Sequence, residues 1–284
     1  MHISNRAIEM NYSPIRKLIP LADDAKKRGL KVYALNIGQP NIVTPDTFFT
    51  GLHNYSEKIV KYSDSRGIEK LIESFIESYK KNDTFFNKED ILITQGGSEA
   101  IFFTLMAICN EGDNILVPEP FYSNYSSFCH FAGAEINPIE TKIENNFHLP
   151  PMEEIEKLIT PKTRAILLSN PSNPTGTVYT RDEILMIGEI AKKYDLYILA
   201  DEVYKQFIYD NTPYTSFTHI PELENRVVLL DSISKHYSAC GARIGLIASR
   251  TYGYDFKILS GKTLCIYNRT ACCSKPYQHN GKLC

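Results

Sequence analysis

The feature that most constrains the fold of this sequence is an alternation of short, continuously apolar runs with longer amphipathic segments. Runs without polar interruptions are typical of strands that are covered on both faces of a sheet. They predict strands at residues 91–94, 114–117, 165–169, 196–200, 227–230 and 244–247. Between two of them, Thr180 and Glu183 form a capping box, after which Ile184, Ile187 and Ala191 follow at helical spacing. This alternation predicts an α/β fold, a mostly parallel sheet with helices on both faces.

Length and composition argue against several other classes of protein. The 284 residues suffice for one large domain or two small ones, and a hydrophobic share of 43% argues against a disordered chain. The formal net charge of -2 gives no electrostatic support for nucleic-acid binding. No apolar run approaches the roughly 20 residues of a membrane helix. Residues 1–10 lack the apolar centre of a secretory signal, so we expect a cytoplasmic protein.

The loops that follow the apolar runs are the candidate site, because ligands of an open parallel sheet bind beyond the carboxyl ends of its strands. The first loop contains Gly96, Gly97 and Ser98 ahead of an apolar helix, which fits a phosphate cradle or a plain strand-to-helix turn. The loop after residue 169 contains two Asn-Pro steps, which predict a stiff turn that holds the Asn173 amide in one direction. A tight loop without a function is the alternative.

An acid and a phenol follow the predicted strand at 196–200. Asp201 is costly to bury at a strand end unless it has a partner. One interpretation is the N-cap of a helix. The other is a carboxylate directed at a cationic nitrogen, with the phenol of Tyr204 nearby as a hydrogen-bond donor.

Hydroxyl and basic residues follow the predicted strand at 227–230, where Ser232, Ser234 and Lys235 precede Arg243. A lone lysine is usually solvated. Two hydroxyls and an arginine suit a phosphate, however, and a lysine at the mouth of a sheet suits a Schiff base with a carbonyl compound.

Short motifs in chain order carry a resemblance to a known family. They are Gly38-Gln39-Pro40, TQGGSEA at 94–100, EPFYSNY at 119–125, NPSNPTG at 170–176, ADEVY at 200–204, and SISK at 232–235 with GARIG at 241–245. Over about residues 10–250 the sequence resembles the fold-type-I pyridoxal-phosphate enzymes, specifically the class I/II aminotransferases related to aspartate aminotransferase. The resemblance implies a cofactor-binding large domain at 46–250, preceded by an N-terminal arm and small-domain segment at 1–45 and followed by an atypical tail at 251–284.

The resemblance implies catalytic roles for Lys235, Asp201 and Tyr204. Lys235 would form a Schiff base with pyridoxal 5'-phosphate and then move the substrate proton. Asp201 would pair with the ring nitrogen and keep it protonated, which makes the ring an electron sink. Asn173 and Tyr204 would donate hydrogen bonds to the phenolic oxygen of the ring.

The remaining implied contacts surround the ring, the phosphate and the substrate. Tyr122 would stack on the ring face. The phosphate would be held by Gly97, Ser98, Ser232, Ser234 and Arg243. Tyr62 resembles a tyrosine that reaches the phosphate of a neighbouring subunit, which would make the full-length protein a homodimer. Gly38 and Asn173 would contact the substrate.

The function implied by this resemblance is the transfer of an amino group between an amino acid and a 2-oxo acid. Two alternatives stay open. One is another fold-type-I enzyme, namely a lyase, a decarboxylase or a synthase. The other is a non-catalytic, truncated remnant that binds the cofactor. The sequence does not identify the amino acid, and its cysteines lack the spacing of a metal site.

The tail at 251–284 differs in character from the rest of the chain. It holds four of the seven cysteines and five basic residues against one acidic residue. It lacks the long amphipathic helix and the carboxylate-binding arginine with which relatives continue, and Arg269 is its only arginine. We therefore expect a C-terminal small domain that is largely absent, through a frameshift or another truncation of the reading frame, and an impaired turnover. Resequencing of the coding DNA tests this expectation.

Overall fold

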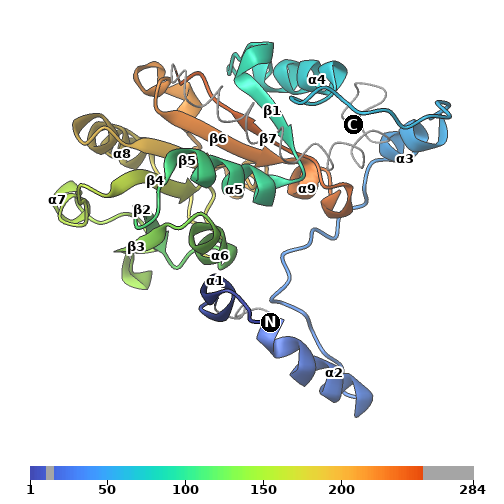
Figure 1. Cartoon of the computed structure of the whole chain (residues 1–284), viewed down its shortest axis with the longest axis horizontal. Helices are drawn as coiled ribbons and strands as arrows, with labels where there is room; N and C mark the ends of the chain where they lie inside the picture. The colour runs from blue at the N-terminus through green and yellow to red at the C-terminus, as the bar shows by residue number, and fades with distance from the viewer. Residues whose placement is uncertain (11–15, 252–284) are drawn as a thin grey trace.

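The protein is organised around one seven-stranded sheet, which the computed structural model describes together with the rest of residues 1–10 and 16–251 (Figure 1). The strand order is β1-β7-β6-β5-β4-β2-β3. The strands are β1 Ile91–Thr94, β2 Asn114–Glu119, β3 Glu135–Glu140, β4 Thr163–Ser169, β5 Tyr197–Asp201, β6 Val227–Ser232 and β7 Gly245–Ala248. Neighbours from β3 to β6 pair in parallel, whereas β7 is antiparallel to both β6 and β1. The predicted α/β fold with a mostly parallel sheet is confirmed.

The sequence analysis missed one strand, β3. Its sequence EINPIE begins and ends with a glutamate and is interrupted by Asn137 and Pro138, so it is not a continuous apolar run. In the structure β3 pairs only with β2 and forms an edge of the sheet, where most of its side chains are not fully buried. An edge strand needs neither the apolar run nor the complete hydrogen-bond ladder of a central strand, so a proline is tolerated there.

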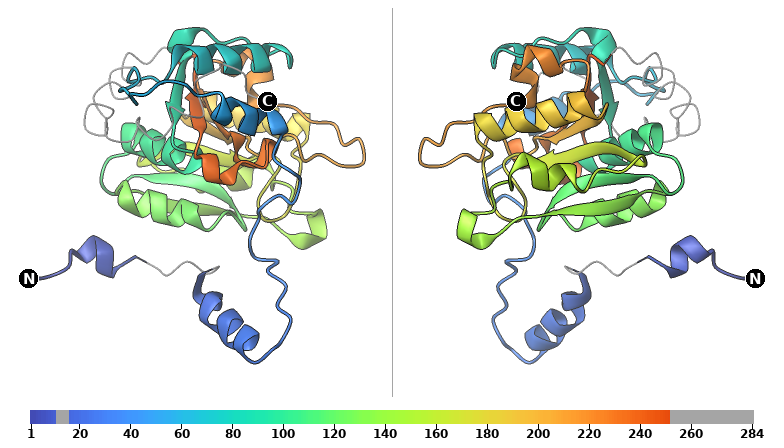
Figure 2. Two further views of the ribbon diagram at one scale, coloured as in Figure 1. Left: turned by 90° about the vertical axis from the view of Figure 1, so that its right-hand side faces the viewer. Right: turned by 90° about the vertical axis from the view of Figure 1, so that its left-hand side faces the viewer.

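Helices cover both faces of the sheet (Figure 2). One apolar core lies beneath α4, α7 and α8, and a second lies beneath α5 and α6. Consecutive strand residues point to opposite cores: Ile115 packs in the second core and Leu116 in the first. Both positions are fully buried, which explains why the central strands are apolar at every residue.

The α-helices differ widely in length. They are α1 Asn5–Ile8, α2 Ile19–Lys27, α3 Asp46–His53, α4 Glu69–Lys80, α5 Gly97–Ile108, α6 Asn124–Phe131, α7 Met152–Glu156, α8 Arg181–Lys193 and α9 Ile233–His236. Short 3₁₀ helices lie at Arg16–Leu18, Lys88–Asp90, Ile143–Asn145, Phe217–His219, Pro221–Leu223 and Cys240–Ala242. The predicted capping box of α8 is confirmed, because Thr180 Oγ1 accepts from the Glu183 backbone N–H while Glu183 Oε2 accepts from the Thr180 backbone N–H.

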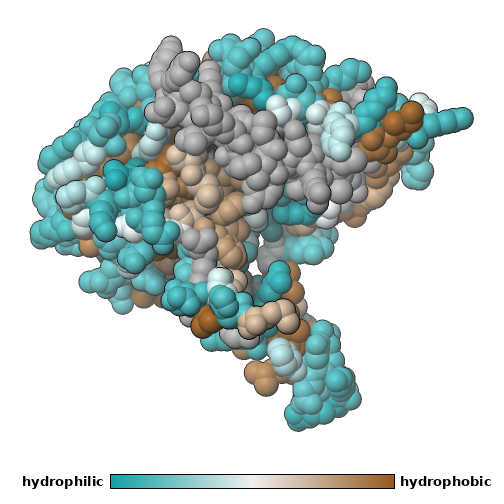
Figure 3. Space-filling model, in the orientation of Figure 1, coloured by the Kyte–Doolittle hydropathy of each residue, from teal (hydrophilic) through white to brown (hydrophobic). Residues whose placement is uncertain are grey.

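The N-terminal segment stands away from the sheet. Figures 1 and 2 show α1 and α2 apart from the main body, joined to α3 by a long extended stretch. Apolar side chains on this segment are exposed, among them Leu21, Leu35 and Val43, and brown patches mark this part of the surface in Figure 3. None of the described helices is both long and apolar enough to pass through a membrane. The domain boundaries at 45 and 250 stay predictions, and the tail at 252–284 lies outside the described residues.

A close backbone contact joins β7 to the loop after β1. Gly245 pairs with Thr94 on one side and with Ser232 on the other, and a Cβ at Gly245 would lie 2.5 Å from the carbonyl carbon of Gly96.

Gly245→Ala is therefore expected to lower the free energy of unfolding by about 1–3 kcal/mol, because the backbone must move to make room for the added methyl group. Urea unfolding measures this loss. Gly241→Ala is the matched control, since a Cβ there meets no atom within 4 Å. Equal urea midpoints for the two variants would contradict the steric explanation.

Candidate active site

The loops at the carboxyl ends of β1, β4, β5 and β6 meet at one cavity of about 140 Å³, which we call the small cavity. It is lined by Gly97, Ser98, Ile101, Tyr122, Tyr125, Ser169, Asn173, Asp201, Val203, Tyr204, Ser232, Ser234, Lys235, Cys240 and Arg243. A large cavity of about 640 Å³ adjoins it and shares Tyr122, Asn173, Tyr204, Lys235 and Cys240 with it. Every site residue predicted from the sequence lines the small cavity except Gly38 and Tyr62. Their individual roles stay predictions.

One end of the small cavity is built to receive an anion. Gly96 caps α5 with a positive φ of 80°, so the free backbone N–H groups of the first helical turn, beginning at Gly97 and Ser98, lie beside the cavity. The Arg243 guanidinium lies next to Gly96 and donates to the Gln95 carbonyl over 3.2 Å. Helix N–H groups, an arginine and the hydroxyls of the Ser232 loop are the donors that bind phosphate in proteins.

Asp201 supplies a buried negative charge to the same cavity. Its side chain is at the end of β5 and only 5% exposed. Burial raises the pKa of Asp201 to about 6, although hydrogen bonds from Tyr125 and from the backbone N–H of Val203 oppose the rise. Within residues 1–10 and 16–251 no basic side chain forms an ion pair with it. A cationic nitrogen in the cavity would complete this environment.

The helix N-cap interpretation of Asp201 is wrong. The chain after β5 forms a turn at 203–206 and no α-helix begins there. The Asp201 Oδ1 accepts from the Val203 backbone N–H over 3.3 Å, a hydrogen bond that stays within this turn. The second carboxylate oxygen accepts from Tyr125 Oη, and the side chain lines the small cavity.

The side chain of Lys235, in α9, reaches the N-terminal segment of the chain. Its Nζ donates to the Gly38 carbonyl over 2.5 Å and lies 5.8 Å from the centroid of the Tyr204 ring. Lys235 lines both cavities, whereas Gly38 lines the large one. The structure thus brings Gly38 and Lys235 together although they are 197 residues apart. The alternative of a lone solvated lysine does not fit an amine in this position.

Two phenols and an amide line the boundary of the two cavities. Burial raises the pKa of Tyr204 to about 12, and the negative charge of Asp201 adds to the rise, so the Tyr204 hydroxyl keeps its proton near neutral pH. Tyr122 Oη accepts from Asn124 Nδ2 over 2.8 Å. Asn173 lines both cavities and begins the second of the two Asn-Pro steps that predict a stiff loop. All three side chains are available to a ligand at this boundary.

Tyr62 is not part of this arrangement. Its side chain is 78% exposed and lines neither cavity. The predicted contact with the phosphate of a neighbouring subunit stays a prediction.

Sequence reasoning assigned no site role to five residues that line the small cavity: Ile101, Tyr125, Ser169, Val203 and Cys240. Tyr125 stands in the EPFYSNY motif three residues after Tyr122, and its partner Asp201 lies 76 residues further along the chain. Cys240 lines both cavities and donates from Sγ to the Ser234 carbonyl over 3.1 Å. The motif was the only sequence signal for Tyr125, and Cys240 had none.

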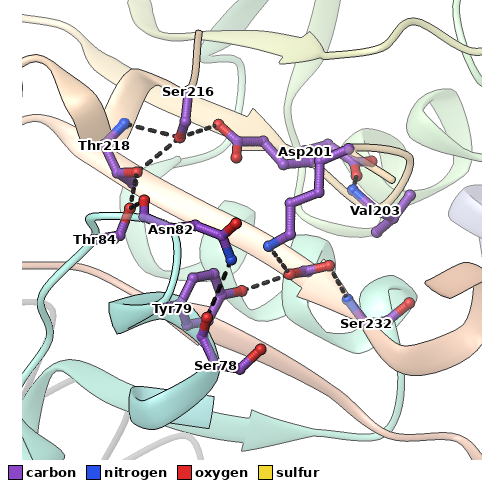
Figure 4. Close-up of polar contacts among 12 residues, drawn as sticks. Ser78, Tyr79, Asn82, Thr84, Asp201, Val203, Ser216, Thr218 and Ser232 are labelled. Atoms are coloured by element: carbon purple, nitrogen blue, oxygen red, sulfur yellow. Dashed lines mark hydrogen bonds and ion pairs between the residues drawn. The ribbon is translucent and has the colours of Figure 1, made fainter. Parts of the chain in front are cut away.

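A second polar network lies at the end of β6 around Asp231, a residue that does not line the small cavity (Figure 4). Asp231 Oδ2 accepts from Tyr79 Oη over 2.5 Å and pairs with Lys205 Nζ over 2.6 Å, while its Oδ1 accepts from the backbone N–H of Ser232 over 2.7 Å. Nearby, the buried Glu202 accepts from Ser216. This network holds the end of β6, where the hydroxyls of the small cavity begin. Among the described residues, no cluster of histidine, cysteine and acidic side chains is suited to a metal ion.

Comparison with known proteins places this geometry in a family. The chain is 35% identical over 271 residues to aspartate aminotransferase of Thermotoga maritima, a match that covers 93% of this chain and 71% of the relative. It is 32% identical to aromatic-amino-acid aminotransferase 2 of Thermococcus litoralis, over 88% of this chain and 64% of that relative. The chain therefore spans roughly two thirds of the length of these relatives.

Solved structures of related proteins have the same fold. The crystal structure of aspartate aminotransferase from Thermotoga maritima superposes with a TM-score of 0.86 at 29% identity, covering 97% of this chain and 74% of that one. Alanine aminotransferase from Pyrococcus furiosus superposes with a TM-score of 0.84 at 26% identity. The family model described as aminotransferase class I and II matches residues 32–265. The chain thus belongs to the class I and II aminotransferase family.

Proposed function

We propose that this chain is a pyridoxal-phosphate-dependent aminotransferase, which moves an amino group from an amino acid to a 2-oxo acid. One observation carries the proposal. A lysine amine, a buried carboxylate without a cationic partner among the described residues, and an anion-binding helix start all line one small cavity at the carboxyl ends of the strands. Members of this family depend on pyridoxal phosphate.

The side chains of the small cavity fit this cofactor at three points. Asp201 offers a negative charge for a protonated ring nitrogen, since among the described residues hydrogen bonds but no ion pair offset its burial. The start of α5, Ser232, Ser234 and Arg243 offer donors for a phosphate. Lys235 offers an amine for an aldehyde. When bound, pyridoxal phosphate supplies an electron-withdrawing ring that acidifies the α-proton of the substrate.

Each residue then has a defined task. Asp201 would hold the proton on the ring nitrogen, and Tyr204 and Asn173 would donate hydrogen bonds to the bound cofactor at the boundary of the two cavities. The Lys235 amine accepts the substrate proton and returns it at a different atom, which is general acid–base catalysis by one group. Tyr122, which lines the same cavity, would pack against the ring.

The large cavity is the proposed space for the substrate. It is lined by Gly38 and Lys235 and also by Arg16, Asn36 and Gln39 from the N-terminal segment. Amide and guanidinium groups are suited to the carboxylate of an amino acid. The identity of the amino acid, the homodimer and the cytoplasmic location stay predictions.

A half-reaction tests the proposed function. The full chain is loaded with pyridoxal phosphate, freed of excess cofactor, and mixed with a single amino acid in the absence of any 2-oxo acid. Aspartate, aromatic amino acids and alanine come first, because the relatives are named for them. We expect one equivalent of the corresponding 2-oxo acid per cofactor site, measured by mass spectrometry. Release of carbon dioxide would instead indicate a decarboxylase, and absence of any product with all amino acids would exclude an active enzyme.

A further inference from the structure

We propose that Tyr125 is a positioning residue of the candidate active site, which keeps the Asp201 carboxylate ionised and fixed in direction through its phenolic hydroxyl. The inference rests on the proposed function, because that function requires Asp201 to be negatively charged opposite a cationic ring nitrogen. Nothing in the sequence pattern assigns a task to Tyr125. Its placement in the fold does.

The contact joins two elements that are distant in the sequence. Tyr125 lies near the start of α6, and Asp201 ends β5. Tyr125 Oη donates to Asp201 Oδ2 over 2.5 Å, and the two side chains are 1% and 5% exposed. Both line the small cavity, so the hydrogen bond lies at its wall and outside the reach of bulk water. A hydrogen bond to a charged group is stronger in such surroundings than in water.

The environment of Asp201 otherwise favours the neutral acid. Burial is the main cause of its raised pKa, and the negative charges of Asp231 and Glu202 raise it further. The phenols of Tyr122 and Tyr204 also face it, and the basic side chains that line the same cavity are Lys235 and Arg243. Within the described part of the chain, the donors to the carboxylate are Tyr125 and the backbone N–H of Val203. Loss of the Tyr125 hydroxyl therefore removes one of two donors.

Packing fixes the direction of the Tyr125 hydroxyl. The ring of Tyr125 lies edge-on to that of Tyr122, with centroids 5.4 Å apart and an interplanar angle of 90°. The ring of Phe121 also stacks with that of Tyr125, with centroids 6.4 Å apart and an interplanar angle of 25°. Burial also holds the pKa of the Tyr125 phenol well above its usual value, so near neutral pH the hydroxyl has a proton to donate. One tyrosine thus contacts both the acid and the aromatic residue that face the proposed cofactor ring.

The fold contains a matched pair for comparison. Tyr79 Oη donates to Asp231 Oδ2 over the same 2.5 Å, and Tyr79 is likewise buried. Asp231, however, also pairs with Lys205 and does not line the small cavity. Tyr79→Phe therefore removes a hydrogen bond of the same kind from a carboxylate outside the candidate site.

The test measures the titration of Asp201 in the full chain without cofactor. Tyr125→Phe is compared with the unmodified protein by difference infrared spectroscopy of the carboxyl stretch, and Asp201→Asn assigns the band. We expect the Asp201 midpoint to rise by about one to two pH units, because a hydrogen bond to a charged group of this strength has been removed. Asp201 would then be mostly protonated near neutral pH. Tyr79→Phe should leave the Asp201 midpoint where it was.

Cofactor binding is the second readout. At pH 7, Tyr125→Phe should bind pyridoxal phosphate about 2- to 10-fold more weakly, because a midpoint raised by one to two units from about 6 lowers the ionised fraction of Asp201 by that factor. The loss should shrink as the pH rises through the new midpoint, because Asp201 ionises again. A loss that does not change with pH would indicate a purely structural role.

Specific outcomes overturn the inference. An unchanged Asp201 midpoint in a folded Tyr125→Phe protein excludes it. If that variant does not fold, incorporation of 3-fluorotyrosine at position 125 keeps the shape and makes the phenol a better donor, so the midpoint must fall. A midpoint that rises as expected in a protein without any half-reaction would count against the proposed function alone, since the titration needs no cofactor.

Discussion

Replacement of Lys235 by alanine is expected to abolish covalent attachment of the cofactor and to slow the half-reaction by about 10²- to 10⁴-fold or more, the usual contribution of a positioned acid–base group. The amine lies where the two cavities meet, and no other described lysine lines either of them. Borohydride treatment of the loaded protein followed by peptide mass spectrometry should find the cofactor on Lys235 in the unmodified chain and on no lysine in the variant.

Two controls separate the amine from the positive charge. Lys235→Arg keeps the charge without a reactive primary amine, so it should fail as Lys235→Ala does. Lys205 is a half-buried lysine that pairs with Asp231 and lines neither cavity, and it should remain unlabelled in every sample. Labelled Lys205, or an undiminished half-reaction in Lys235→Ala, would refute the assignment.

The second large effect is expected at Asp201. Asp201→Ala should lower the half-reaction rate by about 10³-fold, since it removes a charge placed in advance opposite the ring nitrogen. Tyr204→Phe removes one neutral hydrogen bond of about 1 kcal/mol, so its loss should stay below about tenfold. Rapid mixing at saturating amino acid gives both rates.

Asp201→Asn is the control of matched shape. It retains the volume of the side chain and should lose nearly as much rate as Asp201→Ala, because the charge is what matters. Comparable rates for Asp201→Ala and Tyr204→Phe would mean that the carboxylate does not act on the ring nitrogen.

Much of this fold could be predicted from the sequence because its central strands are buried on both faces. Continuous apolar runs located six of the seven strands, including β1 at one edge, and the loops after them contained most of the residues that line the small cavity. The edge strand β3 was missed because most of its side chains are not fully buried, whereas the other edge strand, β1, is buried throughout and has an apolar run. The direction of β7 escaped as well, because an apolar run is the same for either orientation of a strand.

The tyrosines that hydrogen-bond to the acidic residues Asp201 and Asp231 could not be predicted from the sequence. Asp201 and Lys235 lie at or just after strand ends, where a polar residue is a recognisable signal of a binding site. Tyr125 and Tyr79 lie in helices, where the sequence does not distinguish a functional tyrosine from one that packs in the hydrophobic core. Their acidic partners lie 76 and 152 residues away. Contacts of that range are decided by how the helices pack on the sheet, which no local pattern encodes.

The position of β7 in the strand order has a consequence for synthesis of the protein. β7 lies between β1 and β6, so the loops that carry Gly97 and Ser232 are held in register by a strand that is translated after both. During synthesis on the ribosome, the first six strands would therefore be present before β7 joins β1 to β6 and brings the two loops of the binding pocket together. The pocket would be completed late, once Gly245–Ala248 has emerged and been inserted between its two neighbours.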